Sequence, residues 1–239
     1  IKMNDILTND TKAIIVLCGV LSKDSSAKPL TQVEYNKIVQ WLIQKDMRPA
    51  DLLDYNDLGV ISSETKIEQN RLKTLLGRGV QLGFAVEEWQ QNGIWIISRG
   101  DTKYPKRLKK HLKDKAPPLL FGVGNHELLQ GGGLAMVGSR NVDSNGIDFT
   151  KRVAEFCAYN RMPVVSGGAR GVDQISMDSA LNAGGVSIGI VAENLLKKSL
   201  SRQFRNAINN GLLLLISPYH PNARFTVGTA MGRNKLIYS

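Results

Sequence analysis

Two glycine-bearing stretches of this 239-residue chain say most about its fold: LAMVGSR at residues 134–140 and PVVSGGARGVD at residues 163–173. Each stretch begins with a short apolar run and continues into glycines and an arginine. A short apolar run bounded by glycine is typical of a strand that is buried on both faces of a parallel sheet. We therefore predict that each stretch forms a strand, a glycine-rich loop and the beginning of a helix.

The same pattern extends on both sides of these stretches. Further apolar runs occur at residues 94–97, 186–191 and 212–216, and amphipathic segments lie between the runs. Phe156 belongs to one of these segments and is expected to pack inward. Buried strands that alternate with helices indicate a doubly wound α/β domain. We predict an extended Rossmann-like domain with a mostly parallel sheet over residues 94–239.

Residues 1–93 instead show short amphipathic segments between turn signals, which predict a small all-α domain. Thr31 is expected to cap one helix, and Ser63 is expected to begin another that carries Leu72. Short helices with glycine turns resemble sterile-alpha-motif or helix-hairpin-helix modules, and a helical bundle without a special function has the same pattern. Four glycines are expected to interrupt the helices: Gly77, Gly79, Gly83 and Gly93.

The charge is distributed unevenly along the chain. The net charge of +10 comes from 31 basic and 21 acidic side chains. Residues 1–95 carry 11 basic and 12 acidic side chains, a net charge of −1, whereas residues 96–239 carry 20 and 9, a net charge of +11. This asymmetry indicates a polyanionic partner for the second part, such as nucleic acid, an anionic lipid surface or nucleotide phosphate.

The residue pattern argues against a membrane protein and against an enzyme. The longest apolar run, residues 212–216, is far shorter than the roughly 18 residues that span a bilayer. Cys18 and Cys157 cannot form a disulfide framework, so we expect a reducing, cytoplasmic setting. No nucleophile elbow or P-loop is present, and we expect no catalytic residue, metal or cofactor. The histidines lack metal-ligand spacing with either cysteine: His111, His126 and His220.

The two glycine loops are the strongest candidate for a binding site. In a doubly wound sheet, ligands bind beyond the carboxyl ends of the strands, and glycine lets backbone N–H groups approach an anion. Each loop adds an arginine, whose planar guanidinium can bind phosphate with two hydrogen bonds. Asp173, at the start of the following helix, is expected to complement the helix dipole or to brace the loop rather than to act as a general base. The predicted phosphate-binding residues are Gly138, Ser139, Arg140, Gly167, Gly168, Arg170 and Gly171.

A second basic cluster follows the last predicted strand. An arginine beside an aromatic ring suits single-stranded nucleic acid, because the ring stacks on a base and the cation holds phosphate. Taken alone, Phe225 has the character of a core residue. The cluster consists of Arg224, Phe225, Arg233, Asn234 and Lys235.

In their order along the chain, these residues resemble the DprA/Smf family of DNA-processing proteins. The resemblance extends over residues 104–235, and the pair of glycine loops is its most specific part. The matching segments are Tyr104-Pro105, Ala116–Phe121, Gly124-Asn125, Ala135–Arg140, Ser166–Asp173 and Arg233–Lys235.

This resemblance implies a non-catalytic protein that binds single-stranded DNA without sequence preference. In the family, such proteins protect the strand and load it onto the RecA recombinase during natural transformation, usually as homodimers. The family's pocket arginine falls on Arg140 and its late Arg-Asn pair on Arg233 and Asn234. Its loop glycines fall on Gly167, Gly168 and Gly171.

The chain departs from the family pattern in places. Ser176-Met177 stands where the family usually has Ala-His, and Ser217-Pro218 stands where it has Ser-Glu. We therefore identify a divergent member. Because the family continues with further strands after the Arg-Asn pair, we also expect that the chain is truncated after Ser239.

A second hypothesis treats the glycine loops as the site of a nucleotide-like small ligand in signalling or defence. Related phosphoribohydrolases use a Pro-Gly-Gly-x-Gly-Thr loop and a glutamate. The nearest match here, Val227–Ala230, lacks both the leading Pro-Gly-Gly and the acid, which argues against the hydrolase but leaves a nucleotide sensor open. A protein that keeps the fold and binds another protein is a third hypothesis.

Overall fold

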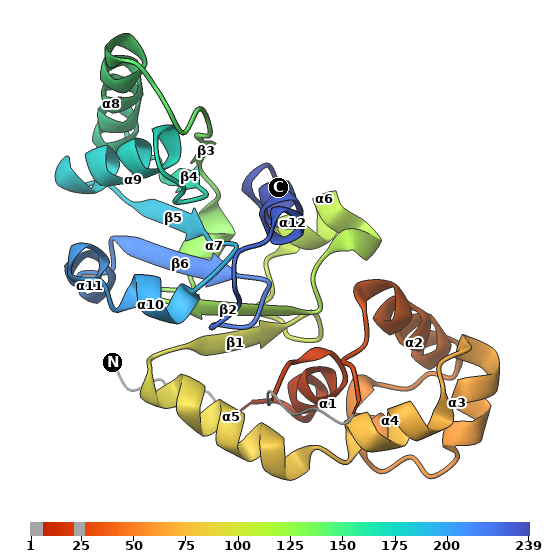
Figure 1. Cartoon of the computed structure of the whole chain (residues 1–239). Helices are drawn as coiled ribbons and strands as arrows, with labels where there is room; N and C mark the ends of the chain where they lie inside the picture. The colour runs from red at the N-terminus through yellow and green to blue at the C-terminus, as the bar shows by residue number, and fades with distance from the viewer. Residues whose placement is uncertain (1–6, 22–26) are drawn as a thin grey trace. The chain divides into compact units, whose positions relative to one another are not determined.

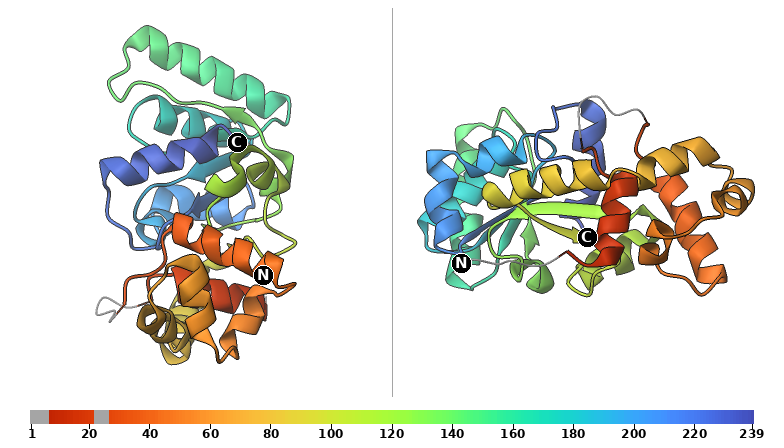
Figure 2. Two further views of the ribbon diagram at one scale, coloured as in Figure 1. Left: turned by 90° about the vertical axis from the view of Figure 1, so that its right-hand side faces the viewer. Right: turned by 90° about the horizontal axis from the view of Figure 1, so that it is seen from below.

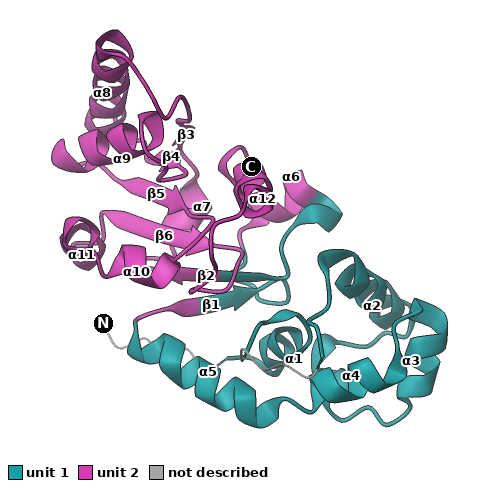
Figure 3. Cartoon of the chain, in the orientation of Figure 1, with its two compact units in different colours: residues 1–92, 96–104, 113–120 teal, residues 93–95, 105–112, 121–239 magenta. Residues whose placement is uncertain are grey.

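The computed structural model describes residues 7–21 and 27–239 (Figure 1). The chain divides into two compact units (Figure 3). Unit 1 comprises residues 1–92, 96–104 and 113–120, and unit 2 comprises residues 93–95, 105–112 and 121–239.

Unit 1 is mostly helical. The helix start predicted at Thr31 is confirmed, and the structure adds a capping box with Glu34. The Thr31 side chain accepts a hydrogen bond from the Glu34 N–H, and the Glu34 carboxylate accepts one from the Thr31 N–H. Helix α2 then buries Tyr35, Ile38 and Trp41 on one face. The helices are α1 (Asn9–Cys18), α2 (Gln32–Gln44), η1 (Pro49–Leu53), α3 (Leu58–Thr65), α4 (Gln69–Leu76), α5 (Gly79–Gln91) and η2 (Lys113–Lys115).

Two expectations for this unit are wrong. Ser63 does not begin a helix but lies inside α3, whose N-terminal cap is Asp57, and Lys66 ends α3 with a left-handed backbone, φ 61°. Gly79 and Gly83 do not interrupt a helix either, because both lie within α5. Glycine only lowers helix propensity by about 1 kcal/mol, which the packing of Ala85 and Trp89 in the core can offset.

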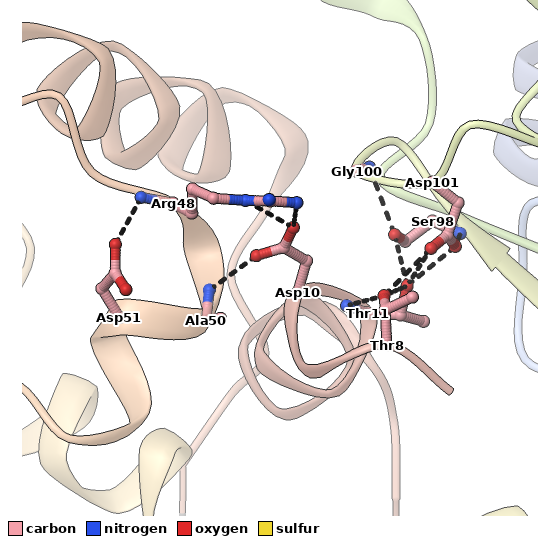
Figure 4. Close-up of polar contacts among 9 residues, drawn as sticks. All are labelled: Thr8, Asp10, Thr11, Arg48, Ala50, Asp51, Ser98, Gly100 and Asp101. Atoms are coloured by element: carbon pink, nitrogen blue, oxygen red, sulfur yellow. Dashed lines mark hydrogen bonds and ion pairs between the residues drawn. The ribbon is translucent and has the colours of Figure 1, made fainter. Parts of the chain in front are cut away.

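Polar side chains join the first helix of unit 1 to the turn at residues 98–101 (Figure 4). Asp101 accepts hydrogen bonds from the Thr11 hydroxyl at 2.7 Å and from the Ser98 N–H at 2.7 Å. On the same helix, Asp10 is buried, accepts a hydrogen bond from the Ala50 N–H at 2.9 Å and pairs with Arg48. These bonds satisfy buried polar groups at the beginning of α1.

Unit 2 contains most of an α/β sheet, of which strands β1 and β2 continue into unit 1 (Figure 3). The strands are β1 (Trp95–Ser98), β2 (Leu119–Val123), β3 (Leu134–Ala135), β4 (Val164–Ser166), β5 (Ser187–Ile190) and β6 (Leu213–Ser217). The helices are α6 (Lys106–Leu112), α7 (Leu128–Gly131), α8 (Ser144–Tyr159), α9 (Val172–Asn182), α10 (Leu195–Ser199), α11 (Arg202–Asn209) and α12 (Val227–Ile237).

The six strands form one mixed sheet in the order β1-β2-β6-β5-β4-β3. Strands β3, β4, β5 and β6 run parallel to one another, and β2 pairs antiparallel with β6. Every residue of β5 and β6 is buried, as expected of strands covered on both faces. The predicted α/β class with a mostly parallel, Rossmann-like sheet is therefore confirmed, and β2 adds an antiparallel strand.

Helices α8 and α9 lie side by side over the β3 end of this sheet (Figures 1 and 2). Asp143 caps α8 by accepting a hydrogen bond from the Gly146 N–H at 2.8 Å. Phe156 is 63% exposed, so the expectation that it packs inward is wrong. The buried face of α8 carries Ala154 and Cys157 instead, and Cys157 is the residue that follows Phe156. This core cluster consists of Met136, Ala154, Cys157, Val164 and Ala180.

Candidate functional site

The two glycine loops leave the same edge of the sheet. Residues 138–140 follow β3, and residues 167–171 follow β4, which is its parallel neighbour, with Ala135 opposite Val165. Because parallel strands end at a common edge, the loops meet there. The prediction that they follow neighbouring strands is confirmed, but the expectation that the first strand is buried on both faces is wrong, because both residues of β3 are exposed.

Glycine is needed where the two loops touch. Gly171 has φ 90°, and a Cβ at this position would lie 2.1 Å from the Ser139 carbonyl oxygen. The same carbonyl accepts a hydrogen bond from the Val172 N–H at 3.1 Å. A Cβ on Gly138 would lie 2.7 Å from the Val172 side chain. These glycines therefore serve contact between the loops, which fixes their backbone N–H groups in place.

Gly168 has a different environment. Its φ is 61°, and a Cβ there would meet nothing closer than the Met177 sulfur at 3.8 Å. It lines a cavity of about 370 Å³ together with Glu193, Asn194 and Lys198. The Lys198 ammonium donates a hydrogen bond to the Gly168 carbonyl at 3.5 Å. Burial lowers the pKa of Lys198, and the Glu193 carboxylate opposes this shift.

Sequence reasoning missed Lys198. The signal was nevertheless available, because Lys198 follows β5 just as the glycine loops follow β3 and β4, and the segments after adjacent parallel strands converge at one edge.

Arg140 and Phe225 form an exposed pair beside the loops. The Arg140 guanidinium carbon lies 5.7 Å from the centroid of the Phe225 ring, which is a cation–π arrangement. The Phe225 side chain is 44% exposed, so it is not a core residue. The structure thus brings residues from the first glycine loop and from the second basic cluster together.

Arg170 is exposed but holds the neighbouring loop. Its Nε donates a hydrogen bond to the Arg140 carbonyl at 3.3 Å, and its Nη2 donates to the Asn141 side chain. Arg140, Asn141 and Arg170 also line an open depression of about 690 Å³. The guanidinium of Arg170 therefore braces the loop that carries Arg140.

The remaining predicted residues lie on or near α12. Arg233 is 6% exposed, and its Nη1 lies 3.7 Å from the Asp173 carboxylate. Burial lowers the pKa of Arg233, and the Asp173 carboxylate opposes this shift. Asp173 accepts a hydrogen bond from the Gly138 N–H at 3.4 Å, which agrees with its expected bracing role. Arg224 and Lys235 are exposed, and Asn234 is half-buried.

The described residues contain no group of three or more His, Cys, Asp or Glu side chains that could hold a metal ion. Among the helices within residues 7–21 and 27–239, none is long and apolar enough to cross a membrane. The site therefore consists of backbone N–H groups, arginines, a lysine and an aromatic ring, a set that suits an anionic ligand with a flat group.

Comparisons with known proteins point to one family. The model of the family described as DNA recombination-mediator protein A matches residues 95–239. The protein named Smf from Synechocystis is 28% identical over 159 residues, which cover 64% of this chain and 39% of that protein. The DNA processing protein DprA of Streptococcus pneumoniae is 32% identical over 124 residues, which cover 51% of this chain and 43% of that protein.

The X-ray structure of DNA processing protein A from Streptococcus pneumoniae has the same fold, with a TM-score of 0.69 and 24% identity. The match covers 97% of this chain and 74% of that chain. Matches to the curated relatives span only 39% and 43% of their length.

Proposed function

The chain belongs to the DNA recombination-mediator protein A family, and on this premise we propose that it binds single-stranded DNA without sequence preference. The observation that carries the proposal is the exposed pair of Arg140 and Phe225 beside the two glycine loops. Arg140 and the loop N–H groups would contact phosphates, while the ring of Phe225 would stack on a base. Neither contact depends on the identity of the base.

We extend the proposal to the role that the family resemblance implies. The bound strand would be protected and passed to the RecA recombinase in the cytoplasm, with the protein acting as a homodimer rather than as an enzyme. The excess of basic residues between residues 96 and 239 supports a polyanionic partner for this part of the chain.

The test is fluorescence anisotropy with a labelled single-stranded oligonucleotide and its duplex, titrated between about 50 and 200 mM salt. We expect binding that favours the single strand and weakens steeply with salt, because bound phosphates release their counterions. Weak binding with no preference for either form would contradict the proposal.

The variant Arg140→Ala is expected to weaken binding roughly five- to tenfold, or ~1–1.4 kcal/mol, on all sequences alike. It should also reduce the slope of log K against log salt by about 0.7, the contribution of one phosphate contact on a single strand. Arg152→Ala on α8 is the matched control, because it removes another exposed arginine of unit 2. Equal effects of the two variants would show that only net charge matters.

The cavity beside Gly168 favours a second function, the binding of a nucleotide-like ligand. Its volume of about 370 Å³ and the side chains of Glu193 and Lys198 suit a small polar molecule. A competition experiment, in which a nucleoside monophosphate is added to the complex with the labelled strand, distinguishes DNA binding from nucleotide sensing. Strong competition by the monophosphate would favour the nucleotide sensor.

A further inference from the structure

The Arg233 guanidinium packs directly against the backbone of Gly167 and leaves no room for a side chain there. A Cβ added to Gly167 would lie 1.2 Å from the Arg233 Nη1 and 2.6 Å from the Asp173 Oδ2. Both Arg233 and Asp173 are 6% exposed. The loop after β4 is therefore glycine at this position because a buried ion pair packs directly against its backbone.

The same ion pair also reaches the loop after β3. The Asp173 Oδ2 faces Arg233 at 3.7 Å, and its Oδ1 accepts the hydrogen bond from the Gly138 N–H at 3.4 Å. One carboxylate on α9 thus connects α12 with the loop that carries Arg140. Since Gly167 lies against the guanidinium, both glycine loops rest on this pair.

A buried ion pair is costly to keep. Two nitrogens of Arg233, Nε and Nη1, are buried and have no hydrogen-bond partner among the described residues. Arg140 and Lys198 are further cations in its electrostatic surroundings. Replacing such a pair with apolar residues is often neutral or stabilising, so the pair is weak evidence for stability and better evidence for a defined geometry.

We propose that Asp173 and Arg233 are positioning residues that set the two glycine loops for single-stranded DNA, and that Arg233 touches no phosphate itself. This inference rests on the proposed function. It differs from the expectation from sequence, in which Arg233 was a phosphate ligand. The ion pair holds the two loops, and the loops in turn hold Arg140 and their N–H groups where we propose that the strand binds.

The effect of removing the Asp173 charge on the affinity for single-stranded DNA tests this inference. Asp173→Asn removes a negative charge, which by electrostatics alone should strengthen binding to a polyanion. We expect instead that single-stranded DNA binds roughly five- to tenfold more weakly, because the loops lose their common support. The salt slope should stay at the wild-type value, since no phosphate contact is removed. Asp148→Asn, at an exposed position on α8, is the control with the same charge change and should not weaken binding.

A second variant addresses Arg233 directly. Arg233→Lys keeps the positive charge but not the planar group that covers Gly167. We expect weaker binding with an unchanged salt slope, and little further loss when it is combined with Arg140→Ala, because both act through the same loop. Losses that add fully to that of Arg140→Ala would mean that Arg233 contributes to binding independently of the loop that carries Arg140, and would overturn the proposal.

Amide hydrogen exchange without DNA separates this inference from the proposed function. In a folded Asp173→Asn variant, the amides of residues 138–140 and 167–171 should exchange faster than in the wild type. If the wild type does not bind single-stranded DNA, the proposed function fails while this measurement still reports on the pair. Unchanged exchange, or Asp173→Asn protein that binds DNA at least as tightly as the wild type, would overturn the positioning role.

Discussion

Three arginines of the site have the same chemistry but different surroundings. Arg140 is exposed above the Phe225 ring, Arg170 donates hydrogen bonds to the loop that carries Arg140, and Arg233 is buried against Asp173. An exposed guanidinium can meet a ligand phosphate, whereas one that donates to a neighbouring loop, or is buried beside a carboxylate, contacts the protein instead. Of the three, Arg140 is therefore the main candidate for direct contact with DNA.

Phe225→Leu tests the stacking contact at the scale of a single residue. Stacking on an aromatic ring contributes about 1–3 kcal/mol per base, so we expect at least a fivefold loss of affinity for single-stranded DNA. The salt slope should not change, because no charge is removed. Phe84→Leu, at a 71% exposed position on α5, is the control. Anisotropy titrations at two salt concentrations give both quantities, and a lower slope would argue against a purely stacking role.

Among the elements, the beginning of α2 shows how charge and capping combine. The Glu34 carboxylate accepts two hydrogen bonds from Arg71, at 2.6 and 3.1 Å, and a third from the Thr31 N–H. The Arg71 hydrogen bonds are the main reason that the pKa of Glu34 falls from 4.5 to about 2. One carboxylate therefore caps α2 and holds Arg71 of α4.

This arrangement makes part of the stability depend on pH. The folded-state pKa of Glu34 lies below its unfolded value of 4.5, so its contribution is present above that pH and is lost as the pH falls toward about 2. We expect Glu34→Gln to lower the free energy of unfolding by ~1–2 kcal/mol near neutral pH. The difference from the wild type should vanish near pH 2. Denaturant titrations between neutral pH and about pH 2 measure this difference in the free energy of unfolding. A difference that persists in acid would contradict the role of the Glu34 carboxylate.

For the whole molecule, the uneven charge matters more than its sum. Residues 96–239, with a net charge of +11, include almost all of unit 2 and the complete candidate site. Such a field attracts any polyanion and speeds association. Under the proposed function, the preference for single-stranded DNA would come from the ring of Phe225 and the shaped loops in addition.

Competition experiments separate attraction by the positive charge from specific binding at the candidate site. If the site binds DNA as proposed, unlabelled single-stranded DNA should displace the labelled strand at a phosphate concentration about tenfold or more below that of inorganic polyphosphate, which cannot stack. Polyphosphate that competes equally well would mean that net charge alone accounts for binding. The concentration of duplex DNA needed to displace the labelled strand should lie between those of single-stranded DNA and polyphosphate.

The sequence by itself determined the features that depend on neighbouring residues. The apolar runs at 163–165 and 212–216 predict β4 and β6 because a buried strand carries its signal within a few residues. Caps such as Thr31 could be read for the same reason. The two glycine loops also followed from local spacing and a rule of parallel sheets. Strand β2 was not predicted as a strand, since its place depends on pairing with β6, which lies far along the chain.

Only the tertiary structure decided what each residue of the site meets. Arg140 and Phe225 are far apart in sequence, as are Gly167 and Arg233, and no local pattern states that they touch. The exposure of Phe156 and the break between α3 and α4 at Lys66 were decided in the same way. Hydrogen bonds within a turn are set by adjacent residues, whereas burial and ion pairing depend on which distant elements pack together. The glycine loops and the charge can therefore be read from the sequence, whereas the exposure and the contacts of each arginine depend on the fold.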